Sequence, residues 1–286
     1  MFEIKISETA NNNVWWSYKM KKIIALYKRY IAPIPLDKCA ALSYYSLLAL
    51  LPGLYILFYC VQLFHISLPG LQNFLNQILP LSSVKQIIDF AIKQTQTSKI
   101  TAIVVIISSL VILSQGVYVF IKYINNLFSI QETSFLQLRI RAFFIALFLV
   151  MTLAFLLIAL MFIFPILTNQ LPIFIYYFIL FLIYVLIHFI LVLLLIKFCL
   201  LKNIPFSILW KGLLFFSITA SLLYLLFSPF IRIFANNYAS YGPLAGFASI
   251  LIFFYVYFVL LFIAVNISAI EYHLKRTDVK LKLTIS

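Results

Sequence analysis

The chain has 286 residues, of which 65% are hydrophobic and 10% are charged, and its mean hydropathy is +1.12. A soluble domain of this length lacks the polar surface groups needed to cover so many apolar side chains, so the composition excludes an ordinary soluble protein. The net charge of +14 would indicate nucleic-acid binding only if the basic residues gathered in a soluble module.

The longest uncharged stretch lies between Arg141 and Lys197 and contains 55 residues. An α-helix rises about 1.5 Å per residue and a bilayer core is about 30 Å thick, so this stretch fits two crossings. Similar windows predict an all-α, polytopic membrane protein. The six predicted transmembrane helices are Cys39–Leu63, Ile100–Ile124, Ala142–Leu167, Ile173–Leu200, Leu209–Phe234 and Gly242–Glu271.

The Lys and Arg residues divide unevenly between the two sides that these helices define. If the N-terminus is inside, 17 of them lie in inner segments and 4 in outer segments. The positive-inside rule then predicts that both tails, residues 1–38 and 272–286, are cytoplasmic. The partners expected for the basic residues are anionic membrane lipids, and nucleic-acid binding is not expected because no basic stretch forms a soluble module with stacking aromatics.

Two further segments of this single membrane domain, residues 1–286, are patterned to lie along the membrane. Aromatic and basic residues alternate between residues 15 and 30, which predicts an interfacial helix in the N-terminal tail. In the extracytoplasmic loop, residues 64–99, apolar residues recur at helical spacing on both sides of Pro80, which predicts two amphipathic helices. These helices rest on the outer leaflet or cap a cavity.

Polar side chains within the predicted spans are the candidate functional residues. An unpaired polar group in hydrocarbon costs roughly 2–7 kcal/mol, so such groups should face one another, a cavity or water. The candidates for lining a cavity or substrate site are Tyr44, Tyr45, Gln115, Asn126, His188 and Asn266. The candidate charges of an inner vestibule are Asp37, Arg139, Arg141 and Glu271. The alternative is structural: solvated acids at the interface, and a hydrogen-bonded histidine within the bundle.

Prolines and glycines mark candidate kinks and close helix contacts. Pro52 and Pro229 each remove a backbone donor from a predicted helix and are expected to kink it. Gly242 and Gly246, with Ser249 nearby, form a small-residue face that would let another helix approach closely.

Motifs for catalysis or metal binding are missing from the sequence. The seven acidic residues have no spacing that would aim two of them at one bond or metal pair, and neither a nucleophile elbow nor a Walker loop occurs. The three cysteines and three histidines share no metal-ligand spacing. We therefore expect no enzymatic activity, no metal and no cofactor.

The run Asp37-Lys-Cys-Ala-Ala-Leu-Ser-Tyr-Tyr-Ser-Leu-Leu-Ala-Leu-Leu-Pro52 resembles the first span of the YihY/BrkB family of bacterial inner-membrane proteins. The segment from Asn126 to Arg141 looks like the family's cytoplasmic turn, and residues 241–269 look like its last span. The resemblance implies a six-span fold in the bacterial cytoplasmic membrane. Asn266 stands where that last span commonly has a carboxylate. Members have been labelled ribonuclease BN, but this chain does not assemble the residues that RNA hydrolysis needs; others are associated with virulence or envelope integrity.

Together these features favour a transporter-like or flippase-like protein that handles a lipidic or amphiphilic envelope component. The alternative is a scaffold that moves nothing, and it predicts spans that pack without a lateral or hydrophilic opening. An ion or small-solute channel is disfavoured because the spans offer few charged groups to line a water-filled pore. The substrate and the oligomeric state are left open by the sequence.

Overall fold

The computed structural model describes residues 24, 27–63, 99–131, 134–170, 172–237 and 243–285. The chain divides into two units, residues 1–35 and residues 36–286. In the first unit a π-helical turn, η1 (Tyr27–Ile31), is described. Most of the predicted interfacial helix and the predicted amphipathic helices of the loop lie outside the described residues, so both stay predictions.

The described part of the second unit consists of long helices and contains no strand. The helices are α2 (Leu36–Leu63), α5 (Lys99–Leu127), α6 (Phe135–Gln170), α7 (Ile173–Cys199), α8 (Phe206–Asn237) and α9 (Pro243–Ile285). Each overlaps one predicted span, so the all-α class is confirmed. The largest departures from the predicted bounds are at α6, which begins at Phe135 rather than Ala142, and at α9, which ends at Ile285 rather than Glu271. The predictions stopped where charged residues begin, whereas a helix can continue past the bilayer core.

Five of these helices are long and apolar enough to cross a membrane. Their candidate spans are Ile107–Leu127, Phe135–Thr152, Phe178–Cys199, Phe206–Phe227 and Phe247–Thr277. The first predicted span coincides with α2, whose 28 residues extend about 42 Å. The side chains of residues 50–63 lie outside the described part of α2, so the sixth crossing stays a prediction.

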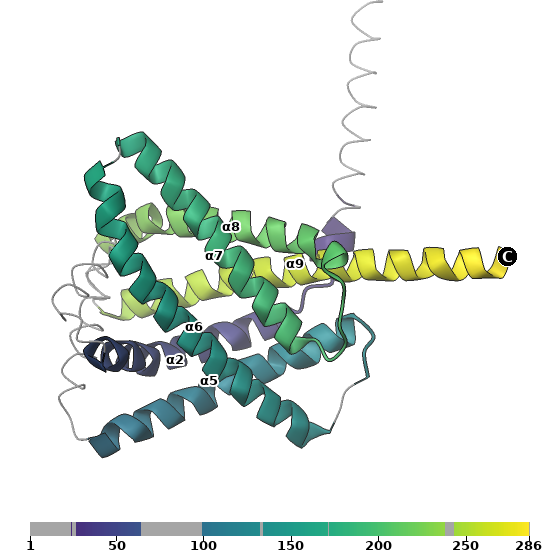
Figure 1. The fold of residues 1–286 in the computed structure, drawn as a ribbon, viewed down its shortest axis with the longest axis horizontal. Helices are drawn as coiled ribbons and strands as arrows, with labels where there is room; N and C mark the ends of the chain where they lie inside the picture. The colour runs from purple at the N-terminus through teal and green to yellow at the C-terminus, as the bar shows by residue number, and fades with distance from the viewer. Residues whose placement is uncertain are drawn as a thin grey trace, which may run out of the picture. The chain divides into compact units, whose positions relative to one another are not determined.

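Most basic residues of the second unit's helices gather at one end of the unit, whereas Lys99 begins α5 and Arg232 lies near the end of α8, away from it. There the last turns of α5 and α7 contact each other through Asn125 and Cys199, and the first turns of α6 contact α7 through Arg141 and Phe198. Figure 1 shows α8 and α9 side by side, with α9 continuing past α8 toward the C-terminus. We call this the basic end; its residues include Lys38, Lys122, Arg139, Arg141, Lys197, Lys202, Lys211 and Lys275. Its predicted place on the cytoplasmic side stays a prediction.

Aromatic side chains of α5 and α9 form the core near the basic end. The ring of Phe262 on α9 lies with its centroid 5.8 Å from that of Phe120 and 4.4 Å from that of Tyr123 on α5. Further along the same pair, the rings of Phe128 and Tyr272 are 5.4 Å apart. These ring contacts hold α9 against α5 and the turn that follows it.

The turn after α5 contains a residue with positive φ, Ser129, at 53°. The Ser129 N–H donates to the Asn126 carbonyl and the Ile130 N–H donates to the Asn125 carbonyl, both at 2.9 Å. These two bonds form a Schellman cap, whose left-handed position normally holds glycine because a Cβ is strained there.

We expect Ser129→Gly to stabilise the protein by roughly 1 kcal/mol. Relief of about 1–2 kcal/mol of left-handed strain exceeds the roughly 0.4–1 kcal/mol lost to a more flexible unfolded chain. Thermal unfolding of the purified protein in detergent measures this change, and a lower midpoint for Ser129→Gly would contradict it.

Candidate functional site

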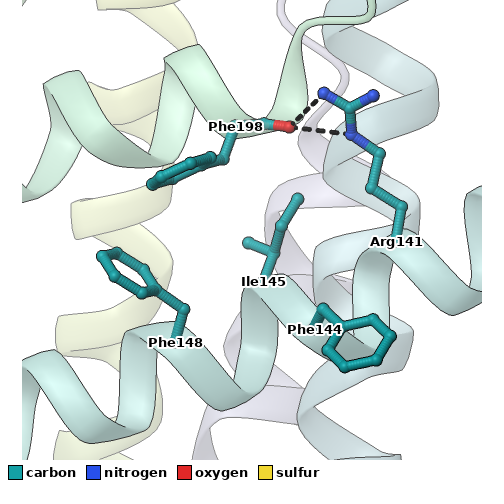
Figure 2. Close-up of a pocket in the computed structure, with 5 residues that line it drawn as sticks. All are labelled: Arg141, Phe144, Ile145, Phe148 and Phe198. Atoms are coloured by element: carbon teal, nitrogen blue, oxygen red, sulfur yellow. Dashed lines mark hydrogen bonds between the residues drawn. The ribbon is translucent and has the colours of Figure 1, made fainter.

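A groove of about 380 Å³ lies between α6 and α7 at the basic end. Its lining residues are Arg141, Phe144, Ile145 and Phe148 of α6 and Phe198 of α7 (Figure 2). We call it the α6–α7 groove. Its volume falls within the range of ligand pockets, roughly 300–1,000 Å³, and Arg141 is the one charged residue among the described residues that line it.

The helical repeat of α6 places the lining residues of the groove on one face. Arg141, Phe144 and Phe148 are spaced by three and four residues, which aligns their side chains along the helix. Phe144 is 63% exposed, and Phe148 and Phe198 are 40% and 42% exposed. The rings of Phe148 and Phe198 meet across the groove with centroids 5.0 Å apart. In a membrane, such exposed phenyl rings contact lipid chains, so the groove opens toward lipid.

The guanidinium of Arg141 is fixed at the head of the groove by backbone carbonyls. Its Nε and Nη2 donate to the Phe198 carbonyl at 2.9 and 2.8 Å, and Nη2 also donates to the Leu200 carbonyl at 2.9 Å. These carbonyls belong to the C-terminal end of α7, where the helix lacks its own donors and its dipole is negative. The described ion pairs join Glu271 to lysines and do not involve Arg141. The remaining guanidinium nitrogen, Nη1, points away from Phe198 in Figure 2.

A second, smaller pocket of about 160 Å³ lies beside the turn between α7 and α8. Its lining residues are Lys197, Leu200, Lys202, Asn203 and Ile204. We call it the turn pocket. Lys197, Lys202 and Asn203 are exposed, and Leu200 is the residue whose carbonyl accepts from Arg141. The two pockets therefore flank the same turn of α7 and bring three basic side chains to it.

The same turn is held from α5 by Asn125, which is 1% exposed. Its Nδ2 donates to the carbonyls of Ile121 at 2.8 Å and Cys199 at 2.9 Å, and its Oδ1 accepts from the Leu201 N–H at 2.9 Å. A buried amide that uses both its donors and its acceptor makes a rigid link. This link gives the α6–α7 groove and the turn pocket a common fixed base.

The structure joins two of the predicted site residues directly. Arg139 Nη1 donates to Gln115 Oε1 at 2.6 Å, which links α6 to α5. Tyr45 lines a separate cavity of about 80 Å³ between the helices, with Gly116 beside it and with mainly apolar walls. Tyr44 is instead 54% exposed on the outside of α2.

His188 lies in a polar cluster between α7 and α8. Its Nδ1 is 2.7 Å from the Tyr184 carbonyl and 3.3 Å from Ser221 Oγ, and the Ser221 hydroxyl donates to the Ser217 carbonyl at 2.8 Å. Donation to the Tyr184 carbonyl requires the proton on Nδ1, which assigns this tautomer. These contacts give the imidazole partners within hydrocarbon, as the structural alternative for His188 requires.

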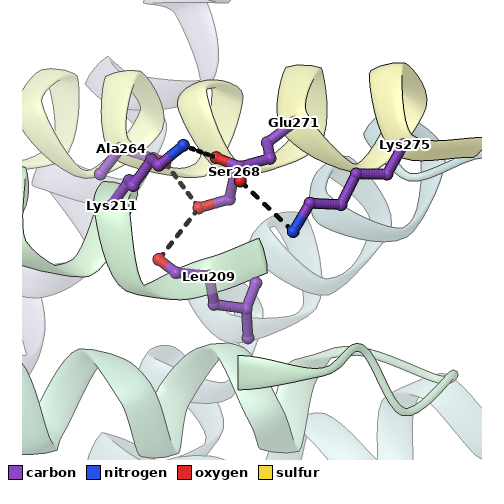
Figure 3. Close-up of polar contacts among 6 residues, drawn as sticks. All are labelled: Leu209, Lys211, Ala264, Ser268, Glu271 and Lys275. Atoms are coloured by element: carbon purple, nitrogen blue, oxygen red, sulfur yellow. Dashed lines mark hydrogen bonds and ion pairs between the residues drawn. The ribbon is translucent and has the colours of Figure 1, made fainter. Parts of the chain in front are cut away.

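The acids predicted for an inner vestibule lie in different surroundings. Glu271, with its side chain 15% exposed, is 2.9 Å from Lys211 Nζ and 3.5 Å from Lys275 Nζ (Figure 3). Asp37 is exposed in the first turn of α2, where the helix dipole favours an acid. Asn266 is buried in α9. The contacts of Glu271 thus tie α8 to α9, and a shared vestibule stays a prediction.

Other predicted positions are only partly described. Asn126 is exposed, and its neighbour Asn125 makes the buried contacts. Helices α2 and α8 continue through Pro52 and Pro229, but these side chains lie outside the described part, as do Gly242 and the surroundings of Gly246.

The sequence prediction missed the close helix contact at Gly212 of α8. A Cβ at Gly212 would clash with the Ala264 carbonyl oxygen and the Ser268 hydroxyl of α9. The signal available in the sequence was the pair Ala264 and Ser268, small residues four apart. The phenyl rings of the α6–α7 groove were missed as well, because nothing local distinguishes them from other apolar residues.

Among the side chains that the structure describes, no group of three His, Cys, Asp or Glu residues is placed to hold a metal ion. What the described residues do assemble is a cation beside an apolar groove. This chemistry suits binding of a molecule with an anionic head and an apolar body.

Comparison with known proteins identifies the family. The family model for virulence factor BrkB matches residues 36–283, which include α2, α5, α6, α7, α8 and nearly all of α9. No curated protein and no solved structure matches the chain. The match confirms the resemblance to the YihY/BrkB family. This multi-pass membrane protein therefore belongs to the virulence factor BrkB family.

Proposed function

We propose that this protein moves an amphiphilic lipid between the leaflets of the bacterial cytoplasmic membrane, as a non-enzymatic transporter or flippase. The lipid enters sideways from the cytoplasmic leaflet at the α6–α7 groove. The observation that carries the proposal is the combination, in one groove open to lipid, of a fixed arginine and exposed phenyl rings.

The order of the groove residues along α6 matches the order of groups in a lipid. Arg141 comes first from the basic end, and Phe148 lies seven residues later, about 10 Å deeper along the helix. An anionic headgroup on Arg141 would therefore leave its chain beside Phe144 and Phe148. A soluble anion would gain nothing from these rings, so the groove favours an amphiphile.

Leaflet exchange in liposomes tests the proposal. The purified protein is reconstituted with headgroup-labelled phospholipids, and a membrane-impermeant reductant destroys the label in the outer leaflet. Protein-free vesicles keep their inner-leaflet signal, whereas vesicles with the protein are expected to lose it as lipids exchange. No acceleration with any anionic or zwitterionic phospholipid would contradict the proposal.

Two phenylalanine variants on α6 locate the effect. Phe148→Ala removes a ring of the α6–α7 groove that contacts Phe198 and should slow exchange about fivefold, the factor expected for one lost aromatic contact. Phe155→Ala removes a ring that is 72% exposed further along α6 and does not line the groove, so it should exchange lipid at the wild-type rate. Equal exchange rates in the two variants would show that transport does not depend on the α6–α7 groove.

A scaffold without transport is the second candidate, and the cavity beside Tyr45 favours it. That cavity, about 80 Å³ with mainly apolar walls, is smaller than ordinary ligand pockets and offers no polar path among the described helices. A scaffold predicts the same lipid exchange with and without protein. It also predicts that, in cells that lack the protein, the Phe148→Ala variant corrects any envelope defect as well as the wild-type protein does.

A further inference from the structure

We infer that the lipid taken at the α6–α7 groove carries two phosphates, one bound by Arg141 in the groove and the other by Lys197 and Lys202 at the turn pocket. Diphosphatidylglycerol, in which one glycerol joins two phosphates, has this chemistry. The inference rests on the proposed function, because it names the class of lipid that the same groove accepts.

Arg141 is prepared to bind the first phosphate. Its bonds to the Phe198 and Leu200 carbonyls hold the planar guanidinium in place, so binding immobilises little additional side chain. Those carbonyls are neutral, and the cation keeps its charge for an external anion. Nη1 provides donors outside these bonds, and guanidinium groups suit the geometry of phosphate oxygens.

Lys197 and Lys202 provide the second phosphate site. Both side chains are exposed and line the turn pocket, together with the amide of Asn203. Lysine binds phosphate as a flexible point charge, which suits the more open of two linked positions. Basic pockets at the cytoplasmic ends of membrane helices are the usual sites for lipids with multiple phosphates.

The two positions are close because Leu200 belongs to both. Its carbonyl accepts from Arg141 Nη2 at 2.9 Å, and the residue also lines the turn pocket. The Asn125 amide holds this turn from behind through Cys199 and Leu201. The fold therefore places the turn pocket next to Arg141, and a lipid with two linked phosphates engages both positions at once.

The apolar lining identifies a lipid rather than a soluble diphosphate as the occupant. Phe144, Phe148 and Phe198 are exposed on helices that are long and apolar enough to cross a membrane, and there lipid chains surround exposed side chains. An acidic peptide or a nucleotide would leave these rings unused.

Native mass spectrometry of the delipidated full chain in neutral detergent tests the inference. Diphosphatidylglycerol, phosphatidylglycerol and phosphatidylcholine are added separately, and the apparent affinity of the first bound lipid is measured. The expected order of affinity, from tightest to weakest, is diphosphatidylglycerol, phosphatidylglycerol and phosphatidylcholine. Inorganic pyrophosphate serves as the soluble diphosphate and is expected not to compete. Equal affinity for all three lipids, or full competition by pyrophosphate, would overturn the inference.

Three variants test which basic residues bind each of the two phosphates. Arg141→Gln should lower the affinity for both anionic lipids about fivefold, the factor expected for the loss of one basic residue near a phosphate. The double variant Lys197→Gln/Lys202→Gln should lower the affinity for diphosphatidylglycerol about 25-fold and leave the affinity for phosphatidylglycerol unchanged. Arg276→Gln, which removes an exposed arginine of α9 outside both pockets, should bind as the wild type.

The lysine variant keeps the test decisive if loss of Arg141 prevents folding, because Lys197 and Lys202 are exposed. Wild-type diphosphatidylglycerol affinity in that folded variant would overturn the inference. The results of these binding experiments can also be distinguished from those of the leaflet-exchange experiment. Selective binding without exchange would refute transport and keep the site, whereas exchange without selectivity would keep transport and refute the site.

Discussion

A Gly212→Ala variant is expected to unfold at a much lower temperature than the wild type. The added Cβ would meet the Ala264 carbonyl oxygen, which is backbone and cannot move aside as the end of a side chain can. Ser268 is held at the same point, because its hydroxyl donates to the carbonyls of Leu209 at 3.4 Å and Ala264 at 3.2 Å (Figure 3). Overpacking costs about 1–3 kcal/mol, and a backbone clash belongs at the upper end. Thermal unfolding monitored by size-exclusion chromatography in detergent measures the loss.

Gly116→Ala is the matched control for that clash. A Cβ on Gly116 of α5 would lie 3.4 Å from the Tyr45 Cβ, an ordinary van der Waals contact. Since alanine also favours a helix over glycine by about 1 kcal/mol, Gly116→Ala should be neutral or stabilising. Similar unfolding temperatures for the two alanine variants would contradict the close α8–α9 contact.

Asn125→Leu is expected to destabilise the protein by about 3 kcal/mol. The change keeps the number and branching of the side-chain heavy atoms and removes three hydrogen bonds, leaving the Cys199 carbonyl and the Leu201 N–H without this partner. Each buried polar group left unsatisfied costs about 1–3 kcal/mol. Because Arg141 and Asn125 hold the same turn of α7, the variant should also weaken anionic lipid binding. Unfolding temperature and lipid retention are measured on the same preparation.

The neighbouring amide provides the control for Asn125. Asn126→Leu makes the same chemical change one residue later on an exposed position, and its effect should stay within about 0.5 kcal/mol. If Asn126→Leu were as harmful as Asn125→Leu, the buried link between α5 and α7 would not exist.

The location of the helices could be predicted because hydrocarbon excludes charge over whole segments. Every long described helix contains an uncharged stretch of at least 20 residues. The ends were predicted less well, since a helix such as α9 continues through charged residues once it leaves the bilayer. With 43 residues α9 extends about 65 Å, well beyond a core of about 30 Å.

For the neighbouring residues Asn125 and Asn126, and for Tyr44 and Tyr45, the helical repeat could have predicted which of the two faces inward. Asn126 follows exposed Lys122 by four residues, whereas Asn125 follows buried Ile121 by four. On α2, Tyr45 follows buried Leu42 by three, which places it on the inward face. The prediction chose Asn126 instead of Asn125 and gave Tyr44 and Tyr45 the same role, because it did not assign polar residues to the faces of a helix.

The α6–α7 groove and the Gly212 contact could not be predicted from local patterns. Phe148 and Phe198 are 50 positions apart, and their meeting depends on how α6 and α7 cross. Gly212 differs from Gly116, the other glycine whose surroundings are described, through Ala264 and Ser268, which lie on a different helix. Such contacts arise from helix pairing, and one sequence does not fix which faces pair.

Photochemical capture of lipid at the α6–α7 groove tests the central claim most directly. The photoreactive residue p-benzoylphenylalanine is placed at position 148, in the groove, or at position 155, which is exposed on the same helix but outside it. After irradiation in native membranes, covalently bound phospholipid is measured by mass spectrometry. The account predicts anionic phospholipid enriched at position 148 over position 155, and loss of that enrichment with Arg141→Gln. The same lipid mixture at both positions, unaffected by Arg141→Gln, would contradict it.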